Sequence, residues 1–289
     1  MRKVIVWGFV SVLAAASAQA QETDGFLSCG EKAGRSPSFL GLEVVGLTSQ
    51  DPQRLVCFSE LLPALSRTIG EVSGLQGDTR LVGIDYRPAT GQLYGLGDFG
   101  GVYVIDPRTA DATYQVTLNV ALSGTNFGVD FNPTVDLLRI VSDGGQNLRA
   151  NVVTGATTVD AALNTPPTAG TTTGVTAAAY TNNDLDATTA TTLFDINTAT
   201  DRIAVQAPPN NGSLNPTGSL RVDAGADAGF DIYSRLSNGI TSDVSAFAAL
   251  SVGGRQRFYR LNLLTGEAQL RGTFRAAHPV VDIAIPLQQ

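Results

Sequence analysis

The chain has 289 residues, with 19 basic and 26 acidic side chains, 31 glycines, 13 prolines and two cysteines. Lysine and arginine form no cluster, so the sequence lacks the charge pattern with which proteins bind nucleic acid. Glycine, threonine and valine are abundant, and good helix formers at helical spacing are few. This composition favours β structure with many turns.

The first twenty residues have the pattern of a secretory signal peptide. Arg2 and Lys3 precede an apolar run at 4–16, and a small-x-small cleavage site follows at 18–20. The apolar run is too short to span a bilayer, and no run of 18 apolar residues follows it. We therefore expect an exported, monomeric protein in the periplasm or outside the cell, without a membrane span. Cleavage before Gln21 leaves a net charge of −9.

Two cysteines, Cys29 and Cys57, follow the signal peptide. An exported chain with two cysteines favours one disulfide, which would tie the segment 21–41 to the rest of the protein. The alternative is one buried and one exposed thiol.

A repeat of about 45 to 53 residues dominates the remainder of the chain. A Gly-x-Asp unit begins at Gly83, Gly128 and Gly229, and Val280 begins a degenerate last copy. A second signature follows, in which a strand ends at Asp or Asn and a threonine comes three residues later. Its anchors are Asp106, Asn151, Asn197 and Asn262. Such Asx residues cap turns, so each repeat reads as four short antiparallel strands.

Four strands per repeat are typical of a β-propeller blade. The predicted blades two to five span 81–122, 126–163, 164–222 and 227–275. Three further strands at 42–48, 54–60 and 66–72 lack an inner strand, which the segment 280–286 supplies by closing the ring. The sequence thus predicts an all-β, five-bladed propeller over 42–286. A β-sandwich is the alternative, and the place of 175–181 within blade four stays open.

Several stretches resemble a bacterial family of unknown function, family 4394 of the domains of unknown function. They are GIDYRPATGQLYGLG, VDFNPTVDLLRIVSDGGQNLRANVVTG, AAAYTNND and FDINTATDRIAVQAPPNNGSL. The resemblance runs from Leu42 to Pro286, and its most specific part is 132–149, whereas 21–41 match least. It implies export and propeller-like repeats but no activity.

The repeated aspartates are the first candidate site. Asp85, Asp130, Asp231 and Asp282 hold equivalent positions on predicted inner strands and would form a ring around the axis, with Ala179 in the fifth place. Carboxylates with carbonyls or water suit Ca²⁺ or Mg²⁺. In the alternative, each aspartate points sideways and accepts backbone N–H groups of the neighbouring blade.

Two loops supply further ligand candidates. Asp143, Gln146, Asn147 and Arg149 surround a tight turn in blade three, and Asp98 occupies the corresponding turn in blade two. Asn182, Asp184 and Asp186 alternate like the first ligands of a calcium loop, but the loop lacks the glycine and glutamate of an EF-hand. Ordinary turn formation and solvation are the alternatives for both loops.

Familiar catalytic motifs are missing from the sequence. The one histidine, His278, precedes a proline and reads as a loop residue, and there is no nucleophile elbow or phosphate loop. We therefore predict a propeller that binds a small molecule, a glycan or a protein, with Ca²⁺ as the candidate cofactor. The alternatives are a carbohydrate-active or other hydrolase or lyase using axial aspartates, and a structural protein of the envelope or matrix.

Overall fold

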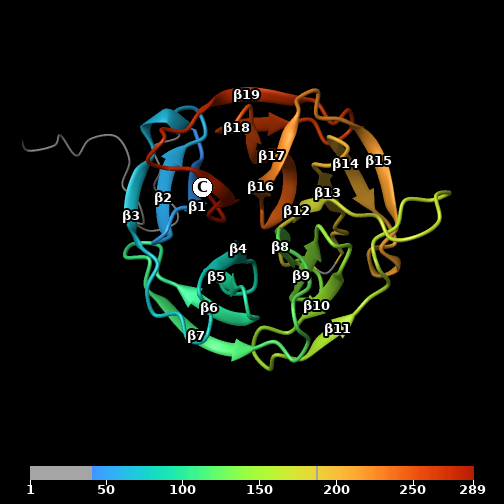
Figure 1. The fold of residues 1–289 in the computed structure, drawn as a ribbon, viewed down its shortest axis with the longest axis horizontal. Coiled ribbons are helices and arrows are strands. Elements are labelled where there is room, and N and C mark those ends of the chain that lie inside the picture. The colour runs from blue at the N-terminus through green and yellow to red at the C-terminus, as the bar shows by residue number, and fades with distance from the viewer. Residues whose placement is uncertain (1–40, 187) are drawn as a thin grey trace, which may run out of the picture.

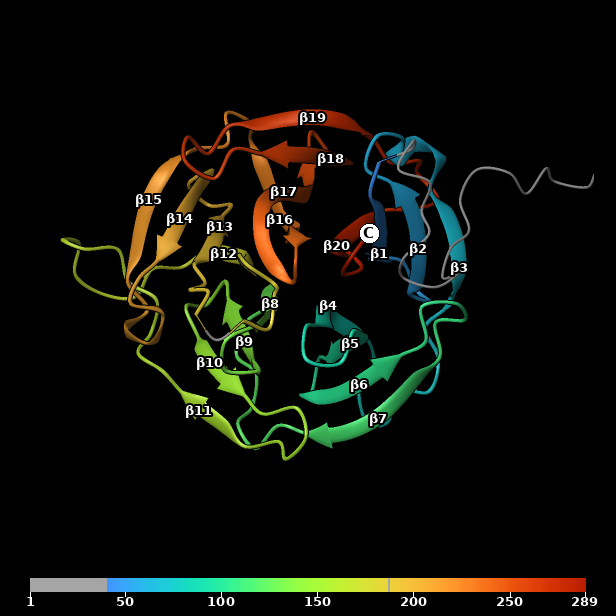
Figure 2. The same ribbon diagram turned by 180° about the vertical axis from the view of Figure 1, so that it is seen from behind.

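The computed structural model describes residues 41–186 and 188–289. Its strands form five four-stranded antiparallel sheets, arranged as a ring of blades (Figures 1 and 2). This confirms the predicted five-bladed propeller. Within the described ranges, no helix is long and apolar enough to cross a membrane.

The strands of each blade follow one another outward from the axis, except that the first blade begins with the last strand of the chain. Blade 1 consists of β20 (Val280–Ala284), β1 (Glu43–Thr48), β2 (Arg54–Ser59) and β3 (Arg67–Glu71). Blade 2 consists of β4 (Leu81–Arg87), β5 (Gln92–Gly97), β6 (Gly101–Ile105) and β7 (Ala112–Thr117). Blade 3 consists of β8 (Phe127–Asn132), β9 (Leu137–Ser142), β10 (Asn147–Ala150) and β11 (Thr157–Val159).

The last two blades have the same plan. Blade 4 consists of β12 (Val175–Tyr180), β13 (Leu193–Asn197), β14 (Arg202–Gln206) and β15 (Leu214–Ser219). Blade 5 consists of β16 (Ala224–Ser237), β17 (Ile240–Val252), β18 (Arg255–Leu261) and β19 (Ala268–Thr273). Two single-turn 3₁₀ helices, Pro63–Leu65 and Pro209–Asn211, lie in connecting loops. Because β12 is innermost in blade 4, it settles the position that the sequence left open.

Closure of the ring occurs between strands from the two ends of the described chain. β20 pairs antiparallel with β1, and Val45 lies opposite Ala284. The C-terminus accordingly lies beside β1 (Figure 1). This pairing confirms the predicted closure and covers the edge that β1 would otherwise expose.

The second sequence signature forms the predicted Asx turns. The Asn151 side-chain oxygen accepts hydrogen bonds from the N–H groups of Val153 and Thr154 at 2.9 and 3.0 Å. Asn262 does the same for Leu264 and Thr265, both at 3.0 Å. In blades 2, 3 and 5 the Asx residue follows the third strand and leads into the fourth, whereas Asn197 ends the second strand of blade 4 and leads into the third.

The glycine of each Gly-x-Asp unit allows neighbouring inner strands to approach closely. A Cβ atom on Gly128 would lie 2.4 Å from the backbone nitrogen of Ala178 in blade 4. One on Gly229 would lie 2.3 Å from the Cα atom of Asp282 in blade 1. Both distances are shorter than any real Cβ contact, so the glycine is required by packing around the axis.

The core is divided among the seams between blades, and each seam contains an apolar cluster. Between blades 5 and 1, for example, Phe58 contacts Phe258 and Phe274 edge to face, with ring centroids 5.0 and 4.9 Å apart. The cluster between blades 3 and 4 has the fewest members. Cys57 is buried in β2, and its predicted partner Cys29 lies outside the described residues.

Candidate functional site at the propeller axis

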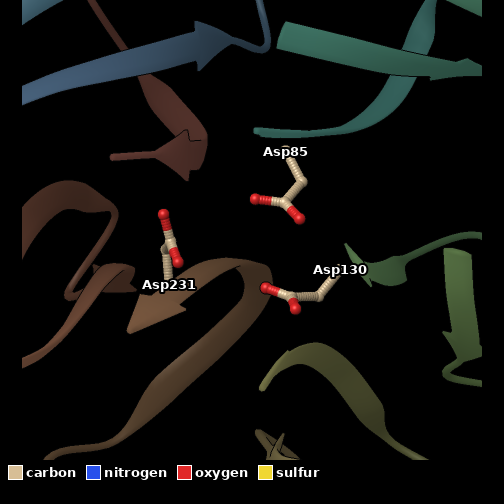
Figure 3. Close-up of side chains that lie close together, drawn as sticks. All are labelled: Asp85, Asp130 and Asp231. Carbon is tan, nitrogen blue, oxygen red and sulfur yellow. The ribbon is translucent and has the colours of Figure 1, made fainter. Parts of the chain in front are cut away.

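Three of the four repeated aspartates meet on the axis. Asp85, Asp130 and Asp231 project from β4, β8 and β16 toward one another (Figure 3). Each offers a carboxylate oxygen that lies within 4.8 Å of the corresponding oxygens of the other two. Their exposures are 6%, 2% and 3%, so all three are buried. We call these three residues the axial triad.

The same aspartates also join the blades. Asp85 accepts a hydrogen bond from the backbone N–H of Phe131 at 2.8 Å, and Asp130 accepts one from Tyr180 at 3.1 Å. The Asp231 carboxylate accepts the N–H of Ile285 at 2.6 Å. Each donor belongs to the next blade around the ring. The two orientations considered from the sequence are therefore compatible, because one carboxylate can reach the seam and the axis together.

The fourth aspartate, Asp282, continues the seam pattern but lies outside the axial triad. Its carboxylate accepts the N–H of Ile84 in blade 2 at 2.8 Å. It is only partly buried and lines a small axial cavity. In blade 4, Ala179 is fully buried and packs with Ile232 of blade 5, so that seam is apolar where the others carry a carboxylate.

Burial makes the charged form of the axial triad unfavourable. Desolvation, followed by repulsion from Asp231, raises the pKa of Asp85 well above its usual value. Desolvation and repulsion from Asp85 raise the pKa of Asp130 in the same way. Desolvation also raises the pKa of Asp231, to about 7, although the N–H groups of Ile285 and Ile232 oppose the shift. Three such carboxylates must share protons or receive a cation.

The axial cavity lies over one end of the ring and is lined by all five blades. Its volume is about 30 Å³, enough for about two water molecules. Polar side chains at its wall are Arg80, Thr125, Asn126, Thr176, Asp227 and Asp282. Asp282, which lines the cavity, accepts an N–H of β4, the inner strand that carries Asp85, so this strand connects the cavity wall to the axial triad.

Two of the loop aspartates hold the loops that form this cavity. Asp98 accepts the N–H of Thr79 at 2.8 Å, and that of the adjacent Arg80 at 3.4 Å. Asp143 accepts the N–H groups of Thr125 and Asn126 at 2.9 and 3.2 Å. The structure therefore places Asp98 and Asp143 behind the cavity wall, where they position the residues that line it.

The other residues of the turn in blade three face protein groups. Gln146 accepts the N–H of Ser123 and donates to the carbonyl of Ala121, both at 2.9 Å. Asn147 is 1% exposed, and Arg149 forms an ion pair with Asp160 at 2.7 Å. The structure does not bring these residues together with the axial triad.

The calcium-like loop is likewise occupied by internal contacts. Asn182 donates to the carbonyl of Ala190, and Asp186 accepts the N–H of Thr188 at 2.8 Å. Asp184 accepts both the N–H and the hydroxyl of Thr241, at 2.9 and 2.6 Å. Asp184 thus fastens this loop to the β16–β17 hairpin instead of converging with the other two side chains.

His278 lies in the loop between β19 and β20, as the sequence predicted, and its side chain is buried there. Its Nδ1 lies 2.8 Å from the Ser66 hydroxyl, and its Nε2 lies 3.0 Å from the Thr68 hydroxyl. Burial and the nearby guanidinium of Arg275 lower the pKa of His278. This contact links β3 to the segment that leads into β20, so its place is at the closure of the ring.

Sequence reasoning missed one pair of buried ionisable side chains. Arg139 on β9 is 1% exposed and Asp195 on β13 is fully buried. Desolvation raises the pKa of Asp195 to about 8, and the Arg139 guanidinium opposes this shift. Neither residue stands in the repeated signature, so no periodicity indicated that they would face each other across a seam.

Comparisons with known structures add likenesses of fold. A protein of unknown function from Bacteroides thetaiotaomicron is 15% identical over 86% of this chain and 65% of its own, with a TM-score of 0.48. The Dos1 propeller is 13% identical over 78% of this chain and 58% of its own, with a TM-score of 0.39. BamB from Moraxella catarrhalis is 11% identical over 82% of this chain and 70% of its own, with a TM-score of 0.29.

This chain thus spans less than two thirds of the first two of these proteins, and all three likenesses are too distant to carry an argument about function. No curated protein matches the sequence. A family model does match, and it covers residues 54–284, from the second strand of blade 1 to the strand that closes the ring. On this match the chain belongs to the family described as a domain of unknown function, DUF4394.

Proposed function

We propose that this protein is an exported binding and scaffold propeller that holds a divalent cation, Ca²⁺ by its ligand chemistry, between Asp85, Asp130 and Asp231. The supporting observation is the convergence of three buried carboxylates whose oxygens lie within 4.8 Å of one another. Hard cations take oxygen ligands, and a carboxylate oxygen that accepts an N–H still has a lone pair for a metal.

The charge balance at the axis favours this assignment. Backbone N–H groups of three blades stabilise the ionised form of these carboxylates, while burial and mutual repulsion oppose it. A cation removes the repulsion and leaves every seam hydrogen bond in place. The bound ion would therefore stabilise the ring. The small molecule, glycan or protein that the propeller binds would contact the axial cavity and the loops around it.

A thermal unfolding experiment tests the cation. We expect the melting temperature of the protein to be higher in millimolar Ca²⁺ than in chelator, because an ion that binds only the folded state stabilises it by mass action. At a concentration one hundred times the dissociation constant the gain is about 2.7 kcal/mol, or several degrees. Asp130→Asn should reduce the shift strongly. Asp243→Asn, on the exposed part of β17, is the matched control and should retain it.

An unchanged melting temperature in Ca²⁺ and in Mg²⁺, together with no binding of either ion by calorimetry, would refute the cation. The axial triad would then be a proton-sharing joint between blades. The hydrolase alternative needs an acid and a nucleophile on either side of a bound sugar. No contact among the described residues around the buried axial triad favours it, and it stays a hypothesis.

Export and the disulfide belong to the same proposal. Their support is the n-region, apolar run and cleavage site at 1–20 and the even number of cysteines. Expression of the full chain in a Gram-negative host should yield a periplasmic or secreted product that begins at Gln21. Its mass should be two hydrogen atoms below that of the fully reduced chain, and accumulation of the uncleaved chain in the cytoplasm would contradict export.

A further inference from the structure

A buried polar network lies between blades 3 and 4, outside the axial triad. Its centre is Arg139 on β9, whose guanidinium donates to four groups within the described residues. The acceptors are the hydroxyl of Tyr180 at 3.3 Å, the side-chain oxygen of Asn147 at 2.7 Å, the carboxylate of Asp160 at 2.7 Å and the side-chain oxygen of Asn210 at 2.9 Å. An arginine side chain has five N–H groups. One hydrogen on Nη2 therefore has no acceptor among the described residues.

Unsatisfied acceptors face this network from blade 4. Neither carboxylate oxygen of Asp195 accepts a hydrogen bond, and the Gln206 Oε1 atom has no donor. The Gln206 amide nitrogen nevertheless donates across the seam to Asn147 at 3.3 Å, which places the side chain beside the network. An isolated buried carboxyl is costly, and native structures rarely leave one without a partner.

Small side chains flank Asp195 on the strands of blade 4. Its cross-strand neighbours are Ala178 on β12 and Ala204 on β14. Both alanines belong to the apolar cluster that faces blade 3, together with Val141 of β9. Two residues farther along these strands lie Tyr180 and Gln206, which both bond blade 3. Asp195 thus stands in the middle of the same face, flanked by the smallest side chains on it.

We propose that this seam contains a binding site for an internal water molecule, held by Arg139, Asp195 and Gln206. The water accepts the remaining Nη2 hydrogen of Arg139 and donates its own two hydrogens to the Asp195 carboxylate and to Gln206 Oε1. One molecule thereby gives a partner to each of the three side chains, Arg139, Asp195 and Gln206. A metal ion is disfavoured by the adjacent guanidinium, and an anion is disfavoured by the Asp195 carboxyl. Buried waters commonly make about three such hydrogen bonds.

This site is independent of the proposed cation, because none of its residues belongs to the axial triad. It assigns a role to the stretch 132–149, from which Arg139 and Asn147 both come. Hydration gives blades 3 and 4 a polar joint where their apolar cluster is small. The water would fix the register of the two blades as well as their separation.

A high-resolution crystal structure of the whole protein tests the water directly. We expect one isolated density peak within about 2.7–3.2 Å of Arg139 Nη2, of an Asp195 carboxylate oxygen and of Gln206 Oε1. An empty site, an anomalous signal from an ion, or a direct bond between Arg139 and Asp195 would each overturn the proposal.

Two substitutions give a second readout. In Asp195→Val, the valine side chain has about the volume of the aspartate side chain and its water together. The variant should have a melting temperature lower by about 4 °C or more, because Arg139 and Gln206 lose the water that connects them. Asp195→Asn keeps an acceptor for the water and should cost less. Asp243→Val at an exposed strand position is the control for the change of residue type. A higher melting temperature for Asp195→Val would contradict the proposal, since a dry seam gains from losing an unpaired carboxyl.

Discussion

An aspartate on an inner strand of this propeller has two neighbours, the next blade and the axis. Asp231 illustrates both, since it accepts the N–H of Ile285 at 2.6 Å and meets Asp85 and Asp130 on the axis. The repeated Gly-x-Asp unit predicted the ring position of such residues, because equivalent places in a closed repeat must meet. It did not predict that Asp282 would lie outside the axial triad, on a strand whose register against β1 shifts next to it.

A pH dependence follows from the raised pKa values. Asp231 has a pKa of about 7 in the folded protein, above the unfolded value of about 3.9. The folded state therefore binds more protons than the unfolded state between these values, and stability falls as pH rises from about 4 to about 7. In chelator, we expect the melting temperature of Asp231→Asn to fall less steeply between about pH 4 and about pH 7 than that of the unmodified chain. Equal slopes of melting temperature against pH for the two proteins would contradict the assignment.

Strand packing around the axis depends on the absence of side chains at chosen positions. The Cβ atom of an alanine at Gly128 would overlap the backbone of Ala177 and Ala178, which cannot move without shifting β12. The sequence showed that this glycine repeats, but only the spatial neighbour explains why.

The loop aspartates Asp98 and Asp143 are a parallel case. The sequence predicted Asp98 and Asp143 as ligand contacts on loops over one end of the ring. Their role as supports of the Thr79 and Thr125 loops depends on contacts that no local pattern records.

Replacing Gly128 tests the inter-strand contact. Gly128→Ala should destabilise the protein by about 2 kcal/mol or more, since overpacking against backbone is relieved only by moving a strand. Chemical denaturation of the purified protein measures the change. Gly144→Ala is the control, because a Cβ atom there would find its nearest neighbour at an ordinary 3.5 Å. If both variants have the same stability, the close approach of β8 and β12 is not the reason that position 128 requires glycine.

The whole molecule is a ring whose number of blades and mode of closure were evident from the repeat. The spacing of the two signatures predicted five blades, and the unmatched strands at the two ends predicted how they join. Blade 4 was the least certain because Ala177 and Ala179 stand there in place of the Gly and Asp of the Gly-x-Asp unit. The approach of Arg139 and Asp195 to each other was not predictable from the sequence. The two residues lie 56 positions apart, and neither belongs to a signature that recurs from blade to blade. A repeat in the sequence predicts features that recur in every blade, but it does not predict contacts that occur in a single seam.

Removal of the closing strand tests this architecture. A chain that ends at Pro279 loses the β1–β20 pairing and the seam bonds of Asp231 to Ile285 and of Asp282 to Ile84. We expect it to lose cooperative thermal unfolding and to self-associate through the exposed edge of β1, as measured by calorimetry and by size-exclusion chromatography. Removal of residues 288–289 alone leaves all of these contacts in place and is the control. Cooperative unfolding of the longer truncation would show that four and three-quarter blades suffice.

The pairing of Val45 with Ala284 also sets the timing of folding. The two residues are 239 positions apart, so a nascent chain has no complete first blade until β20 has been synthesised. Until then, the inner edge of β1 is open and contacts of such long range slow the final step. A polypeptide that forms a stable ring only when β20 is available remains unfolded during most of its synthesis. That property is compatible with the export that we propose, because a narrow translocation pore admits an unfolded chain and not a closed propeller.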